Sequence, residues 1–251
     1  LRQHWQEAGL PEDFHILDSD DQLRLIKRLI RSLKIDDDRW PAKQCQWYIN
    51  AQKDEGLRAG NIEHFDDDYT KTMLDIYKAY EEACERSGMV DFAELLLRAH
   101  ELWLKNPEVL QHYRGRFRQI LVDEFQDTSH TQVRLFAGLT AGWQAGDGRT
   151  LFLVGDGMQS LYGFRNANVG LFLDARYHGV SDIPLENLDL TVNFRSQAQV
   201  IHWVNRMFAE AFPARENTGR GAVTYLPAEA HNAALKGPAV TIDLFEGDPD
   251  G

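Results

Sequence analysis

Hydrophobic side chains recur at three- and four-residue intervals through residues 1–112, the spacing of amphipathic helices. The clearest stripes are Leu23, Ile26, Leu29, Ile30 and Leu33, and then Met73, Ile76, Tyr77, Tyr80 and Cys84. Ser19 opens a capping-box pattern, Ser-Asp-Asp-Gln, before the first stripe. Asp91 is a candidate cap for a further helix, which Pro107 ends. The pattern predicts an almost wholly helical first part.

Beyond Gly115 the pattern changes to short apolar runs that alternate with helical stretches. Strands are predicted at Gln119–Val122 and Leu151–Val154, and helices at Gln132–Leu139 and Val169–Tyr177. The consecutive aliphatic residues of the first strand suit burial on both faces. Alternation of this kind predicts a parallel sheet with right-handed crossovers, and therefore an α/β fold.

The last part of the chain continues the alternation less regularly. A third strand is predicted at Leu188–Val192, followed by a helix that runs to about Ala209. Residues from Phe212 to Pro238 are rich in Gly, Pro and Ala and are expected to be irregular. A late strand is predicted at Ala239–Phe245.

Acidic residues follow both of the first two predicted strands. Asp123 and Glu124 end the first strand, and Asp156 ends the second. Ligands of open parallel sheets bind outside the carboxyl ends of the strands. A carboxylate there can hold Mg²⁺, and its neighbour can orient or deprotonate an attacking water. The pair also fits two solvated acids, and Asp127 fits a helix cap as well as a ligand contact.

Other candidate residues follow the second strand. Gln159 is a neutral polar group that could sense a terminal phosphate. Tyr162, Phe164 and Arg165 bring two aromatic faces and a guanidinium into one short segment. Bases of single-stranded nucleic acid stack on such faces, with about 1–3 kcal/mol per base. The alternative is that both aromatic residues belong to the core.

A further cluster, Asn193-Phe194-Arg195, follows the third predicted strand. The fork of Arg195 can pair with a phosphate and act as an arginine finger across an interdomain cleft. Phe194 can stack on a nucleotide base. Alternatively, Arg195 ties a loop to a carboxylate and has only a structural role.

Three segments, ILVDEFQDT, VGDGMQSLYGFRNA and LTVNFRS, resemble in this order the Walker B, third and fourth motifs of UvrD/Rep/RecB-type superfamily 1 DNA helicases. The helical part is similar to the same family in FHILDSDDQLRLIKRLI, WYINAQKDEG and MVDFAELLLRAHELW. From Leu151 onward the chain is nearer to the RecB and AddA branch. It departs from the family at Gly157, Met158 and Asn166, and it contains no Gly-X-X-X-X-Gly-Lys-Ser/Thr loop.

The resemblance implies a partial P-loop NTPase (RecA-like) parallel sheet with an N-terminal all-helical insertion domain. Residues 1–112 would be the helical accessory domain, similar to domain 1B of the family. Residues 113–184 would form the later half of the first motor domain, 1A. Residues 185–251 would begin the second motor domain, 2A.

The resemblance also implies the cofactors ATP and Mg²⁺ and a role for each site residue. Asp123 would coordinate Mg²⁺, Glu124 would activate water, and Gln159 would contact the γ-phosphate. Phe194 would pack on adenine, and Arg195 would be the finger from the second motor domain.

The DNA contacts are implied in the same way. Tyr162 and Phe164 would stack on single-stranded bases, and Arg165 would join the DNA site to the ATP site. The implied function is that of part of an ATP-dependent 3′→5′ DNA helicase or translocase in repair or recombination. Its partners would be single-stranded and 3′-tailed duplex DNA, with helicase–nuclease subunits as a further option.

Two other functions are compatible with the residues. The chain, which starts at Leu1 without Met, reads as a piece of a longer protein and is predicted to be inactive alone. It could be an ATPase-inactive truncated paralogue that serves as a DNA- or partner-binding module. A metal-dependent nuclease could instead use Asp123, Glu124, Asp127 and Asp156, but this leaves Gln159 without a role.

Composition and charge bear on how the protein could bind nucleic acid and in which compartment it is expected. The formal net charge of −12 argues against a protein that coats nucleic acid by bulk electrostatics, although a narrow stacking groove stays compatible. The two cysteines, Cys45 and Cys84, lack metal-type spacing, which favours a reduced cytoplasmic protein. No apolar run reaches the length of a membrane span. The acidic runs 36–38 and 66–68 are interpreted as solvated caps and turns.

Overall fold

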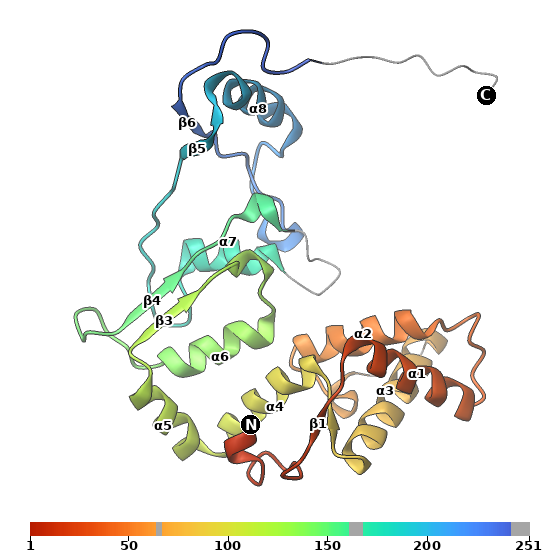
Figure 1. The fold of residues 1–251 in the computed structure, drawn as a ribbon. Coiled ribbons are helices and arrows are strands. Elements are labelled where there is room, and N and C mark those ends of the chain that lie inside the picture. The colour runs from red at the N-terminus through yellow and green to blue at the C-terminus, as the bar shows by residue number, and fades with distance from the viewer. Residues whose placement is uncertain (64–66, 161–167, 242–251) are drawn as a thin grey trace, which may run out of the picture. The chain divides into compact units, whose positions relative to one another are not determined.

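The computed structural model of the chain describes residues 1–63, 67–160 and 168–241. The chain forms two compact units, Leu1–Leu185 and Glu186–Gly251 (Figure 1). The first unit combines a helical part with a small parallel sheet, and the second holds another parallel pair of strands beside a helix. The predicted mixed α/β class is confirmed at this level. Across the described ranges, no helix is both long and apolar enough to cross a membrane.

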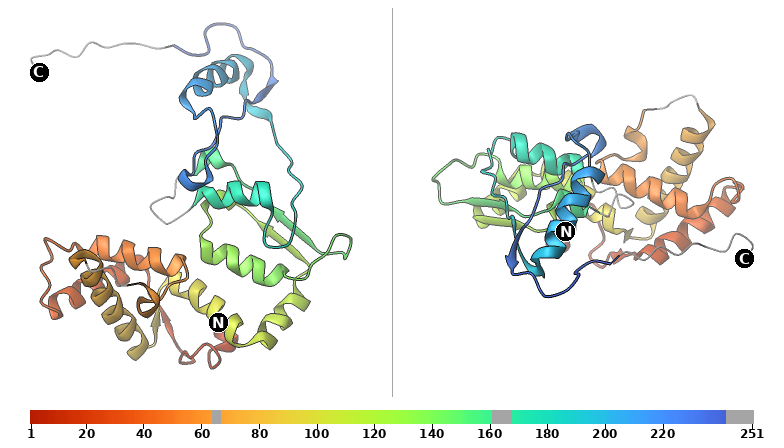
Figure 2. Two further views of the ribbon diagram at one scale, coloured as in Figure 1. Left: turned by 180° about the vertical axis from the view of Figure 1, so that it is seen from behind. Right: turned by 90° about the horizontal axis from the view of Figure 1, so that it is seen from above.

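Helices make up most of the first 116 residues, as the hydrophobic spacing predicts. They are α1 (Ser19–Ser32), α2 (Ala42–Asp54), α3 (Asp68–Arg86), α4 (Phe92–Lys105) and α5 (Pro107–Arg116), with the short 3-10 turns η1 (Arg2–His4) and η2 (Ala59–Asn61). Helices α1, α2 and α3 lie side by side around a core that includes the fully buried Ile26, Ile49 and Tyr77 (Figure 2). The short parallel pair of β1 (His15–Ile16) and β2 (Met89–Val90) was not predicted, because two residues are too few for an alternating pattern.

Acidic side chains begin several of these helices. Asp91 caps α4 by accepting a hydrogen bond from the Glu94 backbone N–H at 2.7 Å, as predicted. Helix α1 is capped by Asp18, not by Ser19, and its Gln22 side chain turns inward instead of closing a capping box. The predicted box was therefore wrong by one position, because Gln22 has buried polar partners in the helical core.

Charged residues are buried among these helices. The Lys53 ammonium, 2% exposed, lies 2.7 Å from Asp91 Oδ2 and 3.0 Å from Glu94 Oε2. The Tyr80 hydroxyl donates a hydrogen bond to the same Asp91 oxygen at 2.7 Å. Gln22 Nε2 donates a further bond to it at 3.2 Å. A buried ion pair is tolerated when its lone pairs are satisfied in this way.

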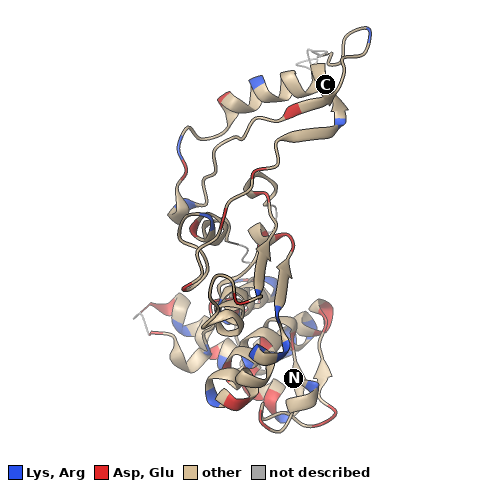
Figure 3. Cartoon of the chain, turned by 90° about the vertical axis from the view of Figure 1, so that its left-hand side faces the viewer, with Lys and Arg blue, Asp and Glu red and all other residues tan. Residues whose placement is uncertain are grey.

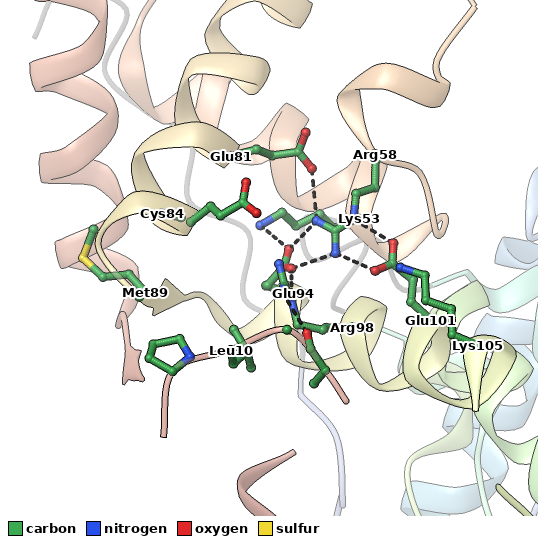
Figure 4. A pocket seen from close by; sticks show the side chains of 15 residues that line it. Leu10, Lys53, Arg58, Glu81, Cys84, Met89, Glu94, Arg98, Glu101 and Lys105 are labelled. Carbon is green, nitrogen blue, oxygen red and sulfur yellow. Dashed lines mark hydrogen bonds and ion pairs between the residues drawn. The ribbon is translucent and has the colours of Figure 1, made fainter. Parts of the chain in front are cut away.

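Arg58 extends this cluster toward α3 and α4 (Figure 4). Its guanidinium contacts Glu81 at 3.1 Å, Glu94 at 2.8 Å and Glu101 at 2.7 Å. Burial opposes ionisation of Glu94, but the charges of Lys53 and Arg58 outweigh burial and lower the pKa of this carboxyl to about 2. The residues line a polar cavity of about 300 Å³. Lys and Arg alternate with Asp and Glu along these helices (Figure 3).

The later part of the first unit contains the predicted parallel strands. They are β3 (Gln119–Val122) and β4 (Thr150–Leu153), and they are followed by helices α6 (His130–Thr140) and α7 (Val169–His178). The two strands pair in parallel from Gln119↔Thr150 to Val122↔Leu153. These elements are confirmed to within a residue or two, because each apolar run is bounded by turn residues.

The prediction that the first strand, β3, is buried on both faces was wrong. Val122 and Leu153 pack into a cluster around the buried Phe125, beneath residues of α6 and α7. On the opposite face, Leu121 is 68% and Phe152 is 51% exposed. An aliphatic run therefore shows that a strand has apolar side chains on both faces, but not that both faces are covered.

Side chains of helix α6 form hydrogen bonds with the end of helix α2. Thr131 Oγ1 donates a hydrogen bond to the carbonyl oxygen of Asp54 at 2.7 Å, and Arg134 Nη1 donates one to that of Glu55 at 2.7 Å. The last carbonyls of a helix receive no hydrogen bond from a following turn of the same helix, and donors on α6 take that place here. Gly56, at φ +82°, ends α2 where an added Cβ would clash with Arg134. The segment that follows β3 is thereby anchored to the helical part.

The second unit pairs β5 (Val192–Gln197) with β6 (Glu229–Asn232) in parallel, beside helix α8 (Ala198–Ala211). The 3-10 turn η6 (Thr218–Arg220) lies between α8 and β6. The strand predicted at Leu188–Val192 was placed too early: residues 188–191 are not assigned to a strand, and the pairing with β6 starts at Val192. Residues 239–241 form no strand, and the rest of the predicted strand at Ala239–Phe245 lies outside the described residues.

The buried charges generate a stability prediction. Lys53→Met should lower the free energy of unfolding by about 3–5 kcal/mol, because Asp91 and Glu94 would stay buried without their shared cation. The control is Arg39→Ala, which removes an exposed pair with Asp68 and should cost less than about 1 kcal/mol. Urea denaturation of both variants measures the difference. Equal losses would contradict the role assigned to burial.

Candidate functional site

The carboxyl ends of β3 and β4 lie side by side at one edge of the first unit's sheet. The pairing continues past the strands, because the Val154 N–H donates to the Val122 carbonyl at 2.8 Å and the Phe125 N–H donates to the Val154 carbonyl at 2.9 Å. The structure thus brings the turn that carries Asp123 and Glu124 next to the segment that carries Asp156.

The turn after β3 has an unusual backbone. Glu124 adopts φ 51° and ψ 41°, in the left-handed region that a residue with a side chain rarely occupies. Such a conformation costs about 1–3 kcal/mol and persists only when the surroundings fix it. Asp123 Oδ1 accepts a hydrogen bond from the Glu124 N–H at 3.0 Å. The fully buried Phe125 anchors the next residue. Both carboxylates are consequently exposed at the sheet edge.

Gln126 joins the two strand ends and was not singled out in the sequence. Its side chain is buried, with the residue 1% exposed. Its Nε2 donates a hydrogen bond to Glu124 Oε2 at 2.6 Å, and its Oε1 accepts one from the Asp156 N–H at 3.0 Å. The available signal was a long polar side chain directly after an anchoring aromatic residue, which periodicity does not detect.

The predicted phosphate-sensing residue lies on the second strand's side of this edge. Asp156 caps the 3-10 turn η4 (Gly157–Gln159), and its Oδ1 accepts a hydrogen bond from the Met158 N–H at 3.0 Å. Its other oxygen, Oδ2, accepts one from Gln159 Nε2 at 2.7 Å. Gln159 is exposed, and Asp156 holds its amide. Hydrogen bonds therefore connect Glu124, Gln126, Asp156 and Gln159 in sequence.

Asp127 has a different place from the helix cap considered for it. Ser129 caps α6 in a full capping box with Gln132. Asp127 is instead the last residue of the 3-10 turn η3 (Phe125–Asp127). It accepts a hydrogen bond at 3.3 Å from the hydroxyl of Ser160, the residue that follows η4. The cap interpretation was wrong because the chain needs two more residues to leave η3 before α6 begins.

The aromatic segment predicted to bind DNA lies outside the described residues. Tyr162, Phe164 and Arg165 all belong to the range 161–167. Their predicted roles therefore stay predictions.

Phe194 and Arg195 belong to the second unit, on β5. The Asn193 side chain accepts hydrogen bonds from the Arg195 N–H at 3.0 Å and the Ser196 N–H at 2.8 Å. This turn coincides with an irregularity in the register of β5. Phe194 is 68% exposed, with its ring centroid 4.6 Å from that of His231. Arg195 is also exposed, so neither side chain belongs to a core.

The donor set at this edge suits a magnesium ion that keeps much of its water. Within the described ranges, no group of three or more His, Cys, Asp or Glu side chains could hold a metal ion. Asp123 is an exposed carboxylate with one oxygen engaged by the Glu124 N–H. Mg²⁺ is commonly bound by one or two carboxylates together with water and substrate phosphates. The single carboxylate fits that mode, whereas the four-carboxylate nuclease site is not formed.

Comparison with known proteins identifies the family of this chain. The UvrD/REP helicase N-terminal domain matches residues 1–178. This chain belongs to that family. It is 49% identical over 214 residues to DNA helicase II of Escherichia coli (strain K12), which covers 82% of this chain and 28% of that protein. The resemblance drawn from the three motifs is thereby confirmed.

Other members are similar over comparable lengths. DNA helicase II of Haemophilus influenzae is 45% identical over 215 residues, covering 83% of this chain and 28% of that protein. The ATP-dependent DNA helicase PcrA of Leuconostoc citreum is 29% identical over 241 residues, covering 92% of this chain and 31% of that protein. The chain thus spans about a third of the length of these UvrD/REP relatives or less.

The packing of Gly155 against Gln126 generates a second prediction. A Cβ at Gly155 would lie 2.7 Å from Gln126 Oε1 and 3.0 Å from the Phe172 ring. Gly155→Ala should therefore lower the free energy of unfolding by about 1–3 kcal/mol, as overpacking does. Gly60→Ala is the control, since a Cβ there meets no atom within 4 Å. Chemical denaturation measures the free energy of unfolding of both variants. Equal values would contradict the close approach of Gly155 to Gln126.

Proposed function

We propose that this chain forms part of an ATP-dependent DNA helicase or translocase that moves 3′→5′ along single-stranded DNA in repair or recombination. One observation carries the proposal: the Asp123–Glu124 turn and the Asp156–Gln159 turn meet at the carboxyl edge of a parallel pair in a UvrD/REP family member. That edge is where open α/β sheets bind their ligands. The names of the relatives, DNA helicase II and ATP-dependent DNA helicase, support the same activity.

The residues take the following parts in this proposal. Asp123 would hold Mg²⁺, which gathers negative charge on the phosphates when ATP is bound. Glu124 would orient a water and accept its proton, since its carboxylate is exposed beside Asp123 and is held by Gln126. Gln159 would contact the terminal phosphate from the adjacent turn.

The resemblance to the family supports a domain plan as part of this proposal. We assign residues 1–112 to a helical accessory domain of the 1B type and residues 113–184 to the later half of a RecA-like motor domain. Residues 185–251 would begin a second motor domain. Phe194 would then pack on adenine, and Arg195 would act as an arginine finger from that second domain. Their exposure at a shaped turn supports both roles.

The DNA side of the proposal concerns Tyr162, Phe164 and Arg165. Two aromatic residues in one segment offer stacking platforms, and the arginine adds a cation, which together suit single-stranded DNA without sequence preference. The segment directly follows the Gln159 turn in the chain. A base step could therefore be coupled to the state of the phosphate. In this proposal the protein works on single-stranded and 3′-tailed duplex DNA.

Glu124→Gln in the intact protein tests the water-activating role. The variant should bind ATP with unchanged affinity but hydrolyse it about 10²–10⁴-fold more slowly, because the amide cannot accept a proton. DNA-stimulated phosphate release and nucleotide binding measure the two steps. Glu12→Gln, at an exposed position of the first unit, is the control. Near wild-type turnover of Glu124→Gln would remove Glu124 from the mechanism, and an intact protein without ATPase activity would favour the binding-module alternative.

Arg195→Ala tests the finger role separately. Turnover should fall about 10³–10⁵-fold while the melting temperature is unchanged, because the exposed side chain stabilises only transition-state charge. Arg206→Ala, another exposed arginine of the second unit, should change neither quantity. If Arg195→Ala mainly lowers the melting temperature, the residue is a structural tie.

A further inference from the structure

We propose that Gln126 is a positioning residue that holds the Glu124 carboxylate in place and couples it to the turn carrying Asp156 and Gln159. This inference rests on the proposed function, in which Glu124 accepts a proton from water. Gln126 itself would touch neither the nucleotide nor the reacting atoms. It would act through the orientation of its neighbour.

The partners of the Gln126 amide fix its orientation. A carboxylate can only accept hydrogen bonds, and a backbone N–H can only donate. Nε2 must therefore face Glu124 Oε2, and Oε1 must face the Asp156 N–H, at the observed 2.6 Å and 3.0 Å. A second donor contact of Nε2 reaches Asp127 Oδ2 at 3.4 Å. The amide is satisfied on both of its ends.

Other side chains cannot make this bridge. Asn is one methylene shorter, so it cannot reach both partners from the same backbone position. Glu would set a second carboxylate against that of Glu124 and would lose the donor. Met has a similar length but no amide, so it would leave the Asp156 N–H without its observed acceptor. Gly155 contributes as well, because a Cβ there would displace Gln126 Oε1.

Positioning matters here because Glu124 is exposed. A free glutamate side chain populates many rotamers, and restricting it to one of them costs conformational entropy. Gln126 is already fixed by burial, since the residue is 1% exposed. Its short bond to Glu124 restricts the carboxylate without further ordering of the protein. A base that is held in advance reacts more often from a productive geometry.

The same amide links the base to the second turn. Asp156 accepts a hydrogen bond from Gln159 Nε2 at 2.7 Å and donates its own N–H to Gln126. A shift of the Gln159 turn would therefore move the Asp156 N–H, which is hydrogen-bonded to Gln126, the residue that holds Glu124. Nucleotide contact at Gln159 and proton acceptance at Glu124 would be coupled through Gln126.

Gln126→Met, combined with Glu124→Gln in a double-mutant cycle, tests the positioning role in the intact protein. Gln126→Met alone should lower kcat about 10–100-fold at unchanged KM for ATP, because a misplaced base loses rate and not binding. In the Glu124→Gln background it should cause no further loss, since no base is left to position. An equal further loss in that background would overturn the proposal.

Two more variants separate positioning from folding. Gln46→Met removes another buried glutamine, 8% exposed in the helical core, and should lower stability without changing kcat. Gln126→Glu should lower kcat at least as far as Gln126→Met, because it adds like charge beside Glu124. If kcat of Gln46→Met falls in proportion to its loss of stability, as kcat of Gln126→Met does, then stability alone sets the rate. That result would overturn the proposal.

A final readout does not depend on ATP hydrolysis. In the 251-residue chain, the NMR resonances of the Gln126 side-chain amide should shift in Glu124→Gln and not in Glu12→Gln. If the Gln126 resonances shift but Glu124→Gln does not change turnover, the hydrogen bond between the two residues is confirmed and the proposed function is overturned. Absence of the shift would overturn the positioning role, even if Glu124 is the base.

Discussion

The parallel pairing of β3 and β4 is the interaction on which the candidate site depends. Four matched residue pairs align the strands, and two more backbone hydrogen bonds carry the alignment into the turns. The buried Gln126 amide then closes the gap between these turns. Because parallel strands end at the same edge, acids far apart in sequence become neighbours there. The left-handed backbone at Glu124 is held by the same contacts.

The helical part supports this edge from a distance. Lys53 and Arg58 gather carboxylates from α3 and α4 into one cluster that is buried around Lys53 and partly exposed around Arg58, and these contacts fix how the helices pack. At the end of α2, Thr131 of α6 donates to the carbonyls of Lys53 and Asp54, and Arg134 donates to that of Glu55. Helix α6 begins just past the turn that holds Glu124 and Gln126. The first unit is therefore continuous from its buried charges to its candidate site.

Prediction from the sequence succeeded where a local signal was strong and failed where pairing decided. The strand at Gln119–Val122 and the cap at Asp91 were found because apolar runs and capping residues act locally. The third strand was placed too early, since Leu188 and Leu190 are aliphatic but lack ladder partners, and β5 starts at Val192 where β6 pairs. The burial of Gln22 and Gln126 was missed because a buried glutamine is identified only by its partners.

The sequence by itself determined the helical first part, the alternating second part and the acids at the strand ends. Hydrophobic spacing and residue chemistry carry this information directly. Only the tertiary structure decided which face of β3 is covered, that Lys53 is buried among carboxylates, and that Gln126 joins Glu124 to Asp156. These features depend on contacts between residues distant along the chain, and such contacts leave no periodic trace in the sequence.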